Sequence, residues 1–165
     1  MEVTLRKISE EDKPVLANLI ELYRYDLSLY DGSRPNRHGL FGYRWLDSYW
    51  TSNKRHPFFI MADGEIAGFV LVNDFCRLCE PGEANSIAEF FVLSGLRRRG
   101  VGREAAIKVF RKFPGKWEVL QHSENTPSMD FWESVIYDLT RGQYRKLEAE
   151  TDDWTGQALI FTLNP

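Results

Sequence analysis

Hydrophobic and polar positions in the first part of the chain follow two different spacings. Val3 to Leu5 alternates apolar and polar side chains, which predicts a short first strand. Apolar residues from Val15 to Tyr23 then recur at helical spacing and predict a helix that runs through about Leu29. Ser9, with an acid three residues on, predicts a capping box before that helix. The run Asp31 to Asn36 breaks the pattern.

A second helix is expected around Tyr43 to Trp50, in a stretch rich in aromatic residues. These residues are Phe41, Tyr43, Trp45, Tyr49 and Trp50. They fit either a stripe that faces the core, which we favour, or the aromatic wall of an acceptor pocket.

The pattern in the middle of the chain predicts several strands. Pro57 to Ala62 and Ile66 to Asn73 are apolar, β-rich runs, and the Asp63-Gly64 pair between them is a strong hairpin signal. Ser86 to Leu93 predicts a further strand, buried on both faces. A helix is expected after Gly102, followed by a strand at Trp117 to Leu120. Thr126 as N-cap and Pro127 in the first turn predict a further helix through about Ile136. The last elements expected are strands at Tyr144 to Ala149 and Ala158 to Leu163, around a turn at Asp152 to Gly156.

The resulting order is β-α-α-β-β-β-α-β-α-β-β. Hairpin strands combined with strand–helix–strand crossovers predict a mixed sheet with helices on its faces. The chain has 165 residues and shows no repeat or linker, which predicts a single domain over residues 1–165.

Composition and charge exclude several classes of protein. The hydrophobic fraction of 43% is ordinary for a globular protein, and a net charge of −3 argues against a surface built for nucleic acid or acidic membranes. No uncharged apolar run approaches the ~18 residues that span a bilayer. The N-terminus is charged from its second residue and lacks the apolar core of a signal peptide. We therefore expect a cytoplasmic protein with no membrane or nucleic-acid partner.

Cys76 and Cys79 are the only cysteines, and their C-x-x-C spacing can mean a redox pair or half of a zinc site. A structural zinc site takes four ligands, and His38, His56 and His122 show no paired spacing. A redox pair gains its low thiol pKa at a helix start, whereas this pair stands in a predicted loop. We interpret the cysteines as ordinary reduced thiols and predict no metal site.

An anion site is predicted where the strand Ser86 to Leu93 leads through Arg97-Arg98-Arg99-Gly100-Val101-Gly102-Arg103 into a helix. The first N–H groups of a helix lack intrahelical acceptors, and the helix dipole adds positive charge there. Glycines allow a ligand close to the backbone, and arginines add charge. The expected guest is a phosphate or pyrophosphate. The dinucleotide fingerprint and the Walker pattern both fail here.

This loop resembles the signature of the GNAT superfamily of acetyl-CoA-dependent N-acyltransferases, Gln/Arg-x-x-Gly-x-Gly/Ala between a strand and a helix. Arg97, Gly100 and Gly102 match all three fixed positions. Val92 stands where the family usually has valine, and Ser94 replaces the usual proline.

Downstream, Asn125-x-x-Ser128-x-x-Phe131-Trp132 resembles the family's second cofactor motif, Asn-x-x-Ala-x-x-Leu/Phe-Tyr. The order of elements agrees along the whole chain. The resemblance implies an α/β (α+β) fold, with a mixed, mostly antiparallel central sheet and helices on both faces.

The resemblance also implies acetyl-CoA as co-substrate. Backbone amides from Arg98 to Arg103 would hold the pyrophosphate, and the main chain of Phe91 and Val92 would pair with the pantetheine arm as an added strand does. In the family this strand splays from the next, here Trp117 to Leu120. The cofactor-binding residues expected are Phe91, Val92, Arg97, Arg98, Arg99, Gly100, Val101, Gly102, Arg103, Asn125 and Ser128.

Glu89 is the candidate catalytic base, because an acceptor amine must lose a proton to attack the thioester. Alternation places Glu89 on the same strand face as Ile87 and Phe91, and such burial raises a carboxyl pKa toward the working range. The alternative is a strand-edge Glu paired with an Arg, and the two readings are equally weighted.

The usual catalytic acid of the family is a tyrosine, but Trp132 stands at that position. An indole donates a hydrogen bond but cannot protonate a thiolate. Tyr137, Tyr144 or water could substitute, so no acid is assigned.

The acceptor is expected to be a small-molecule or peptide amine, and its identity cannot be read from the sequence. Its pocket would be lined by the first two helices and their connection, Tyr23 to Trp50, with the last hairpin as a further candidate. Three carboxylates in that region, Asp26, Asp31 and Asp47, together with its aromatics suit a cationic amine. The alternatives to an enzyme are a CoA-binding sensor or scaffold and a nucleic-acid binder that uses the basic loop, which the acidic net charge disfavours. Members of the family are often dimers, so a homodimer is also allowed.

Overall fold

The computed structural model describes residues 1–152 and 154–165. Its elements follow the predicted order. In chain order they are β1 Val3–Lys7, η1 Glu10–Asp12, α1 Lys13–Asp31, α2 Ser48–Thr51, β2 His56–Ala62, β3 Glu65–Asn73, β4 Asn85–Val92, η2 Ser94–Leu96, α3 Val101–Lys112, β5 Gly115–His122, α4 Thr126–Thr140, β6 Arg145–Thr151 and β7 Trp154–Leu163.

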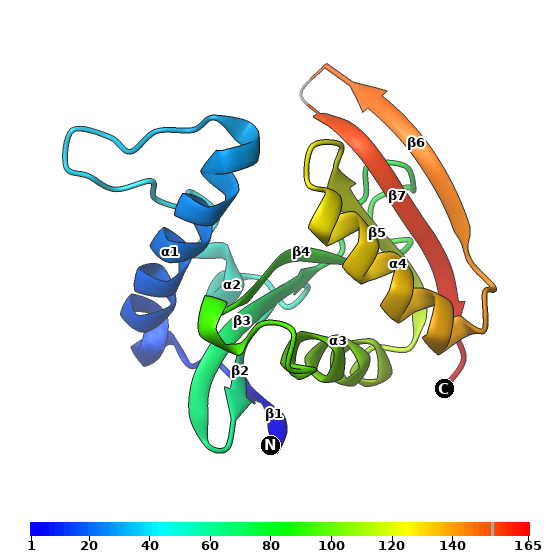
Figure 1. Ribbon diagram of the computed structural model, residues 1–165, viewed down its shortest axis with the longest axis horizontal. Coiled ribbons are helices and arrows are strands. Elements are labelled where there is room, and N and C mark those ends of the chain that lie inside the picture. The colour runs from blue at the N-terminus through cyan, green and yellow to red at the C-terminus, as the bar shows by residue number, and fades with distance from the viewer. Residues whose placement is uncertain (153) are drawn as a thin grey trace.

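All the strands form one seven-stranded sheet in the order β1-β2-β3-β4-β5-β7-β6. Neighbouring strands are antiparallel except β4 and β5, which are parallel and pair only at Asn85–Trp117 and Ser86–Glu118. Beyond these pairs the two strands separate, so the sheet has two arms (Figure 1). The predicted mixed, mostly antiparallel sheet and the splay between these two strands are both confirmed.

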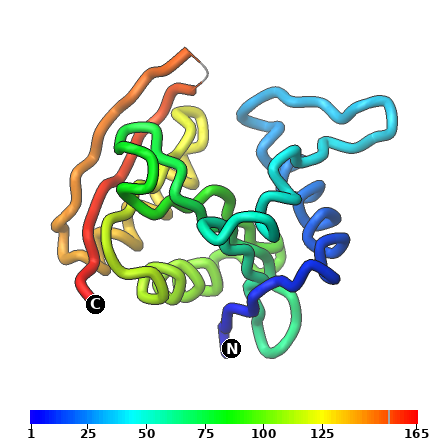
Figure 2. The backbone as a smooth tube through the Cα atoms, turned by 180° about the vertical axis from the view of Figure 1, so that it is seen from behind, coloured from blue at the N-terminus to red at the C-terminus, as the bar shows by residue number. Residues whose placement is uncertain are grey.

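Helices cover both faces of the sheet. One buried cluster joins side chains of α3 and α4, such as Val109 and Trp132, to β2–β5 and β7. A second cluster joins α1 and α2, through Leu16, Ile20 and Tyr49, to the other face. The α1–α2 connection lies at the same end of the molecule as the end of β6 and the start of β7, on the opposite side of the split (Figures 1 and 2).

The β2–β3 hairpin shows how local sequence sets local structure. Asp63 and Gly64 have φ values of 51° and 83°, so both take the left-handed conformation that the Asp-Gly turn signal predicts. Gly68 in β3 meets a different demand, because a Cβ there would lie 1.9 Å from the main-chain oxygen of Phe91. A side chain at residue 68 would therefore push β3 and β4 apart.

Several boundaries differ from those predicted. The Ser9 side chain makes no capping hydrogen bond, because a turn of 3₁₀ helix, Glu10–Asp12, intervenes before α1. The helix expected around Tyr43 to Trp50 is mostly turn, and only Ser48–Thr51 is helical.

Differences also occur near the C-terminus. The N-cap of α4 is Asn125 rather than Thr126, because the Asn125 side chain accepts the hydrogen bond from the Ser128 amide at 3.1 Å. The turn predicted at Asp152 to Gly156 is shorter, because β7 already begins at Trp154. Residue 153 of that predicted turn lies outside the described residues.

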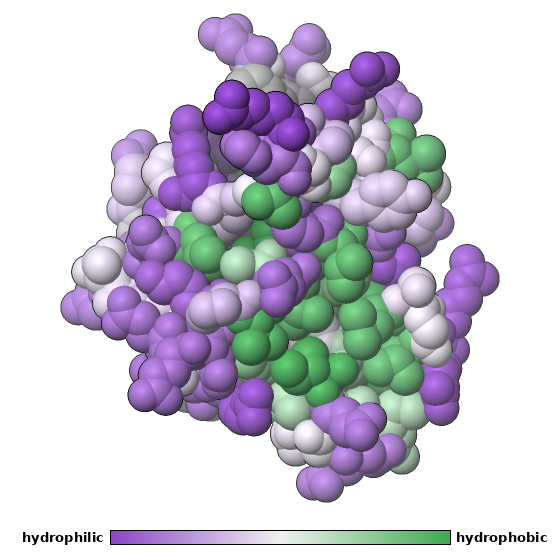
Figure 3. Space-filling view, turned by 90° about the vertical axis from the view of Figure 1, so that its left-hand side faces the viewer, coloured by the Kyte–Doolittle hydropathy of each residue, from purple (hydrophilic) through white to green (hydrophobic). Residues whose placement is uncertain are grey.

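The surface on the α1 side carries hydrophobic residues over its centre and lower part (Figure 3). From α1 itself, Val15, Leu22 and Leu29 keep 38%, 52% and 80% of their surface exposed. Among the described residues, no helix has the length and apolar character needed to cross a membrane.

Candidate active site

Glu89 lies in β4 next to an irregularity in the strand. Leu71 pairs with Glu89 and Val72 pairs with Ile87, so Ala88 is an extra residue that forms a β-bulge. The bulge breaks the alternation on which the prediction for Glu89 rested. Ile87 packs in the cluster beneath α3 and α4, whereas Phe91 packs in the cluster beneath α1 and α2. The expectation that both share the face of Glu89 is therefore wrong.

The Glu89 carboxylate is held by an aromatic cluster that reaches it from α1. The Tyr23 hydroxyl donates a hydrogen bond to Oε2 of Glu89. The Tyr23 ring in turn packs edge-on against Phe69 and Phe91, with ring centroids 5.5 and 5.9 Å away. Glu89 is half-buried as a residue.

Burial raises the pKa of Glu89 to about 7, despite the opposing effects of the Tyr23 hydrogen bond, the positive charge of Arg24 and the Tyr43 hydroxyl. The candidate base therefore titrates in the range where a general base is most useful. Burial also raises the pKa of Tyr23 and of Tyr43, so both phenols stay protonated at neutral pH. The buried Tyr49 hydroxyl has no hydrogen-bond partner within the described part of the chain.

A cavity of about 1340 Å³ opens beside Glu89. Its wall comes from the C-terminal half of α1, the segment from Phe41 to Trp45, the start of β4, and the end of β5 with Asn125. The cavity thus reaches from the α1–α2 connection to the point where β4 and β5 separate. Glu89 therefore lies in the cavity wall between the α1–α2 connection and the separation of β4 from β5.

The α1–α2 connection is tied to α1 by one acidic and one basic side chain. The Glu21 carboxylate accepts hydrogen bonds from the amides of Phe41 and Gly42 at 2.6 and 2.8 Å. Arg24 donates from Nη1 to the Gly42 carbonyl at 3.1 Å. These contacts position Tyr43 against the cavity.

The aromatic stretch divides between the core and a cavity. Tyr49 and Trp50 pack with the core cluster of α1, Phe41 and Trp45 line the cavity, and Tyr43 does both. Two of the three carboxylates expected to bind a cationic amine form ion pairs with the protein instead. Asp26 pairs with Arg97 and Asp47 pairs with Lys13 at 2.9 Å, and of the three only Asp31 lines the cavity.

The predicted anion loop has the backbone geometry of such a site. Arg98 and Gly100 take left-handed conformations with φ of 59° and 86°, and α3 begins at Val101 directly after them. The free amides of the first turn of α3 therefore lie at the end of β4. Gly102 falls inside that turn, where a Cβ would come within 3.4 Å of the Phe131 ring.

The arginines of this loop do not all face a ligand. Arg97 ion-pairs with Asp26 of α1 and donates from Nε to the Val92 carbonyl at 2.8 Å. Arg103 ion-pairs with Asp138 of α4. Arg98 and Arg99 are exposed and form no ion pair with a described carboxylate. Two of the four basic side chains therefore brace the loop.

The tyrosines considered as catalytic acids lie away from the cavity. Trp132 is buried and packs against Phe90, Phe110 and Phe131. Tyr137 is 56% exposed, and the Tyr144 hydroxyl donates to Glu133 at 2.8 Å. Neither tyrosine lines the cavity.

Sequence reasoning missed the two tyrosines that surround Glu89. Tyr23 belongs to the apolar helical pattern that begins at Val15, and Tyr43 is one of the aromatic residues between Phe41 and Trp50. The only signal was an aromatic cluster, which looks the same whether it fills a core or lines a site.

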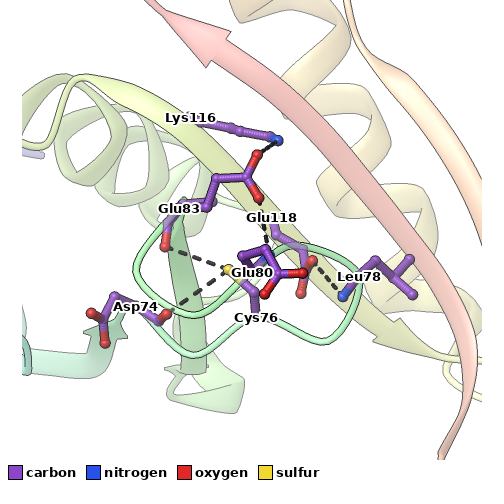
Figure 4. Close-up of polar contacts among 8 residues, drawn as sticks. Asp74, Cys76, Leu78, Glu80, Glu83, Lys116 and Glu118 are labelled. Atoms are coloured by element: carbon purple, nitrogen blue, oxygen red, sulfur yellow. Dashed lines mark hydrogen bonds and ion pairs between the residues drawn. The ribbon is translucent and has the colours of Figure 1, made fainter.

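The two cysteines lie in the loop between β3 and β4, where Figure 4 shows Cys76. Both are free thiols, and their sulfur atoms and a Glu118 oxygen all lie within 4.8 Å of one another. Glu118 is fully buried, and its carboxylate accepts hydrogen bonds from the main-chain amides of Arg77 and Leu78 at 2.8 and 3.0 Å. These hydrogen bonds anchor the loop to β5.

Burial raises the pKa of Cys76 to about 12, and burial with Glu118 raises that of Cys79. These thiols are therefore not activated as a redox pair is. Cys76, Cys79 and Glu118 together offer three candidate metal ligands, one fewer than the four that a closed structural zinc site takes.

The family model described as "Acetyltransferase (GNAT) family" matches residues 19–136, which cover the loop, Glu89 and most of α4. The chain therefore belongs to the GNAT acetyltransferase family. No curated protein matches the chain.

Solved structures share its fold. An acetyltransferase from Thermus thermophilus has a TM-score of 0.72 at 14% identity, with 99% of this chain and 98% of that chain covered. The aminoglycoside acetyltransferase AAC(6')-Ib in complex with coenzyme A and kanamycin has a TM-score of 0.69 at 16% identity, with 98% and 95% covered.

Proposed function

We propose that this protein is an N-acetyltransferase that moves the acetyl group of acetyl-CoA to a primary amine by direct attack on the thioester. The observation that carries the proposal is the Glu89 carboxyl, whose pKa is raised to about 7, at the wall of a cavity that ends where β4 and β5 separate. The anion loop begins at the far end of the same strand β4.

The pyrophosphate and the pantetheine arm of acetyl-CoA would bind to neighbouring segments of the chain. The amides from Arg98 to Arg103 would bind the pyrophosphate at the start of α3. Because β4 pairs with β5 only at Asn85 and Ser86, its edge from Ile87 onward is open toward β5. The main chain of Phe91 and Val92 would bind the pantetheine arm there. Asn125 and Ser128, at the start of α4, would contact it from the other side.

Glu89 would act as the general base. An ammonium acceptor loses two protons, one before attack and one from the nitrogen of the tetrahedral adduct. In its ionised form Glu89 accepts one of them, directly or through one water, and the other passes to solvent. The neutral nitrogen attacks the thioester carbon, the carbonyl π electrons move to oxygen, and they return as the C–S bond breaks. The products are the acetylated amine and the thiolate of coenzyme A. Tyr23 holds the carboxylate in position through its hydrogen bond.

The leaving thiolate does not require a tyrosine acid. A thiol is a good leaving group, and neither Tyr137 nor Tyr144 lines the cavity. Water that enters the open cavity supplies the proton in this scheme, so the tryptophan at position 132 is compatible with catalysis.

The second candidate is a module that binds CoA without transferring an acetyl group, as a sensor or scaffold does. Trp132 favours it, because the usual acid is missing. A homodimer is a further proposal, and the exposed apolar residues of α1 are the candidate surface for its interface.

Two measurements separate the candidates. Saturating acetyl-CoA should raise the thermal midpoint by mass action in either case. Release of free coenzyme A thiol in the presence of an amine panel should occur only if the protein is an enzyme. An unchanged midpoint with no calorimetric heat would reject the cofactor assignment. A raised midpoint with no thiol release across the panel would favour the binding module.

A further inference from the structure

The wall of the cavity beside Glu89 is dominated by positive charge. Four arginines line it, Arg24, Arg44, Arg55 and Arg77, against two carboxylates, Asp31 and Glu89. Arg24, Arg44 and Arg55 form no ion pair with a carboxylate of the described residues. The cavity therefore presents a surplus of cationic groups to any molecule that enters it.

The guanidinium groups are held in place by aromatic rings, which do not neutralise them. Arg44 lies 4.5 Å from the ring centre of Trp45, and Arg55 lies 5.8 Å from the same ring. Arg55 also lies 5.6 Å from the Tyr49 ring. Such a cation–π contact leaves the N–H groups of a guanidinium available to a planar anion.

Arg24 is positioned closest to the chemistry. It lies 5.9 Å from the Phe41 ring, and its single hydrogen bond goes to the neutral Gly42 carbonyl. Its charge is close enough to Glu89 to favour the ionised carboxylate. The cationic groups and the candidate base thus share one cavity.

The two carboxylates of the cavity offset only part of this charge. Asp31 accepts hydrogen bonds from the Ser33 amide at 2.8 Å and from the Ser33 hydroxyl at 2.6 Å, so it is occupied with its own turn. Glu89 is occupied by Tyr23 and is needed as the base. A polycationic acceptor would meet three unpaired arginines and only one exposed acid.

We infer that the acceptor is a primary amine that also carries an anionic group, a carboxylate or a phosphonate, which Arg24, Arg44 and Arg55 bind while the amine faces Glu89. This inference rests on the proposed function and names its substrate class. It sets the chain apart from its structural neighbour whose structure contains kanamycin, an aminoglycoside. The arginines would recognise the anion through charge-assisted hydrogen bonds, which leaves the amine end of the acceptor to the Glu89 carboxylate.

The test uses matched pairs of acceptors that differ only in the anionic group. The pairs are L-phenylalanine and 2-phenylethylamine, L-tyrosine and tyramine, L-histidine and histamine, and 2-aminoethylphosphonate and ethylamine, with kanamycin as the polycation. Thiol release at saturating acetyl-CoA gives kcat/KM for each. At least one pair should favour its anionic member by about tenfold or more, the value of one lost charged hydrogen bond. The phosphonate pair tells the two kinds of anion apart.

Variants then locate the effect. Arg55→Gln and Arg44→Gln should raise KM for the anionic member about tenfold and leave unchanged both the affinity for acetyl-CoA and the KM for the partner that lacks the anionic group. Arg145→Gln, on the exposed face of β6 and outside the cavity, is the matched control and should change neither. Loss of preference in the cavity variants alone would assign the anion to this wall.

Two results would overturn the inference. One is equal or better turnover of the amines that lack an anionic group, or of kanamycin, which would leave the proposed function intact. The other applies if no amine of either kind is acetylated, so that the proposed function fails. Calorimetry with the same pairs in the presence of coenzyme A then tests binding alone. The anion site is rejected if the protein shows no preference for the anionic members. It is also rejected if Arg55→Gln keeps that preference.

Discussion

The hydroxyl of Tyr23 in α1 donates a hydrogen bond to the carboxylate of Glu89 in β4, 66 residues later in the sequence. This contact joins the helix that borders the acceptor side of the cavity to the strand that leads to the anion loop. Burial raises the pKa of Glu89, and the hydrogen bond lowers it. The protonation state of the candidate base is therefore set by a balance between these two effects, and that balance can be shifted by mutation.

Tyr23→Phe should move the pH dependence of the reaction. The phenol hydrogen bond favours the ionised carboxylate, so its removal should raise the pKa of Glu89 further. The acidic limb of the kcat/KM profile, which follows ionisation of the base, should shift to higher pH. Tyr25→Phe, at a 69% exposed position of the same helix, is the control. A profile that stays in place in the Tyr23 variant would disconnect Glu89 from the limb.

Glu89→Gln should keep the affinity for acetyl-CoA and lower kcat/KM by about 10² to 10⁴, the usual range for a positioned acid–base group. The loss should shrink at high pH, because the acceptor amine then loses its proton in solution. Steady-state kinetics from about pH 6 to pH 10, with calorimetry for the cofactor, measure both. A variant within about threefold of the wild type at every pH would make Glu89 a structural residue.

Glu89 should also make the fold less stable as pH rises. Its folded pKa of about 7 lies above the 4.5 of an unperturbed glutamate, so the native state holds this proton more tightly than the unfolded state does. The free energy of unfolding should then fall between about pH 4.5 and pH 7 because of this group. Glu89→Gln removes the effect, so it should raise the thermal midpoint at about pH 8 more than at about pH 4.5. The reverse order would mean that the carboxylate stabilises the fold in its ionised form.

Gly100→Asp should abolish or strongly weaken acetyl-CoA binding without unfolding the chain. Residue 100 has open space around it, but its φ of 86° and its place before the first turn of α3 bring its backbone toward the expected pyrophosphate. The new carboxylate would repel that anion. Gly100→Asn has the same shape without the charge, and both Asp and Asn tolerate a left-handed backbone better than most residues. Isothermal calorimetry should show a larger loss for Asp than for Asn. Equal affinities in folded variants would place the phosphates elsewhere.

Much of the candidate site was predictable because its signals are local. The Asp-Gly turn, the order of strands and helices, and the loop from Arg97 to Arg103 depend on backbone preferences of neighbouring residues. The left-handed conformation of Gly100 and the start of α3 at Val101 follow from those preferences. For the same reason Glu89 could be located in the strand that leads to this loop.

The sequence by itself determined the element order, the fold family and the anion loop, because hydrophobic periodicity and turn chemistry act over a few residues. Only the tertiary structure decided which side chains meet Glu89. The bulge at Ala88 turns Ile87 and Phe91 to opposite faces, and strict alternation cannot anticipate an extra residue. Tyr23 approaches from another element, and the arginines of the cavity come together from separate segments. Such contacts depend on how helices and strands pack across long separations in sequence, which no local pattern records.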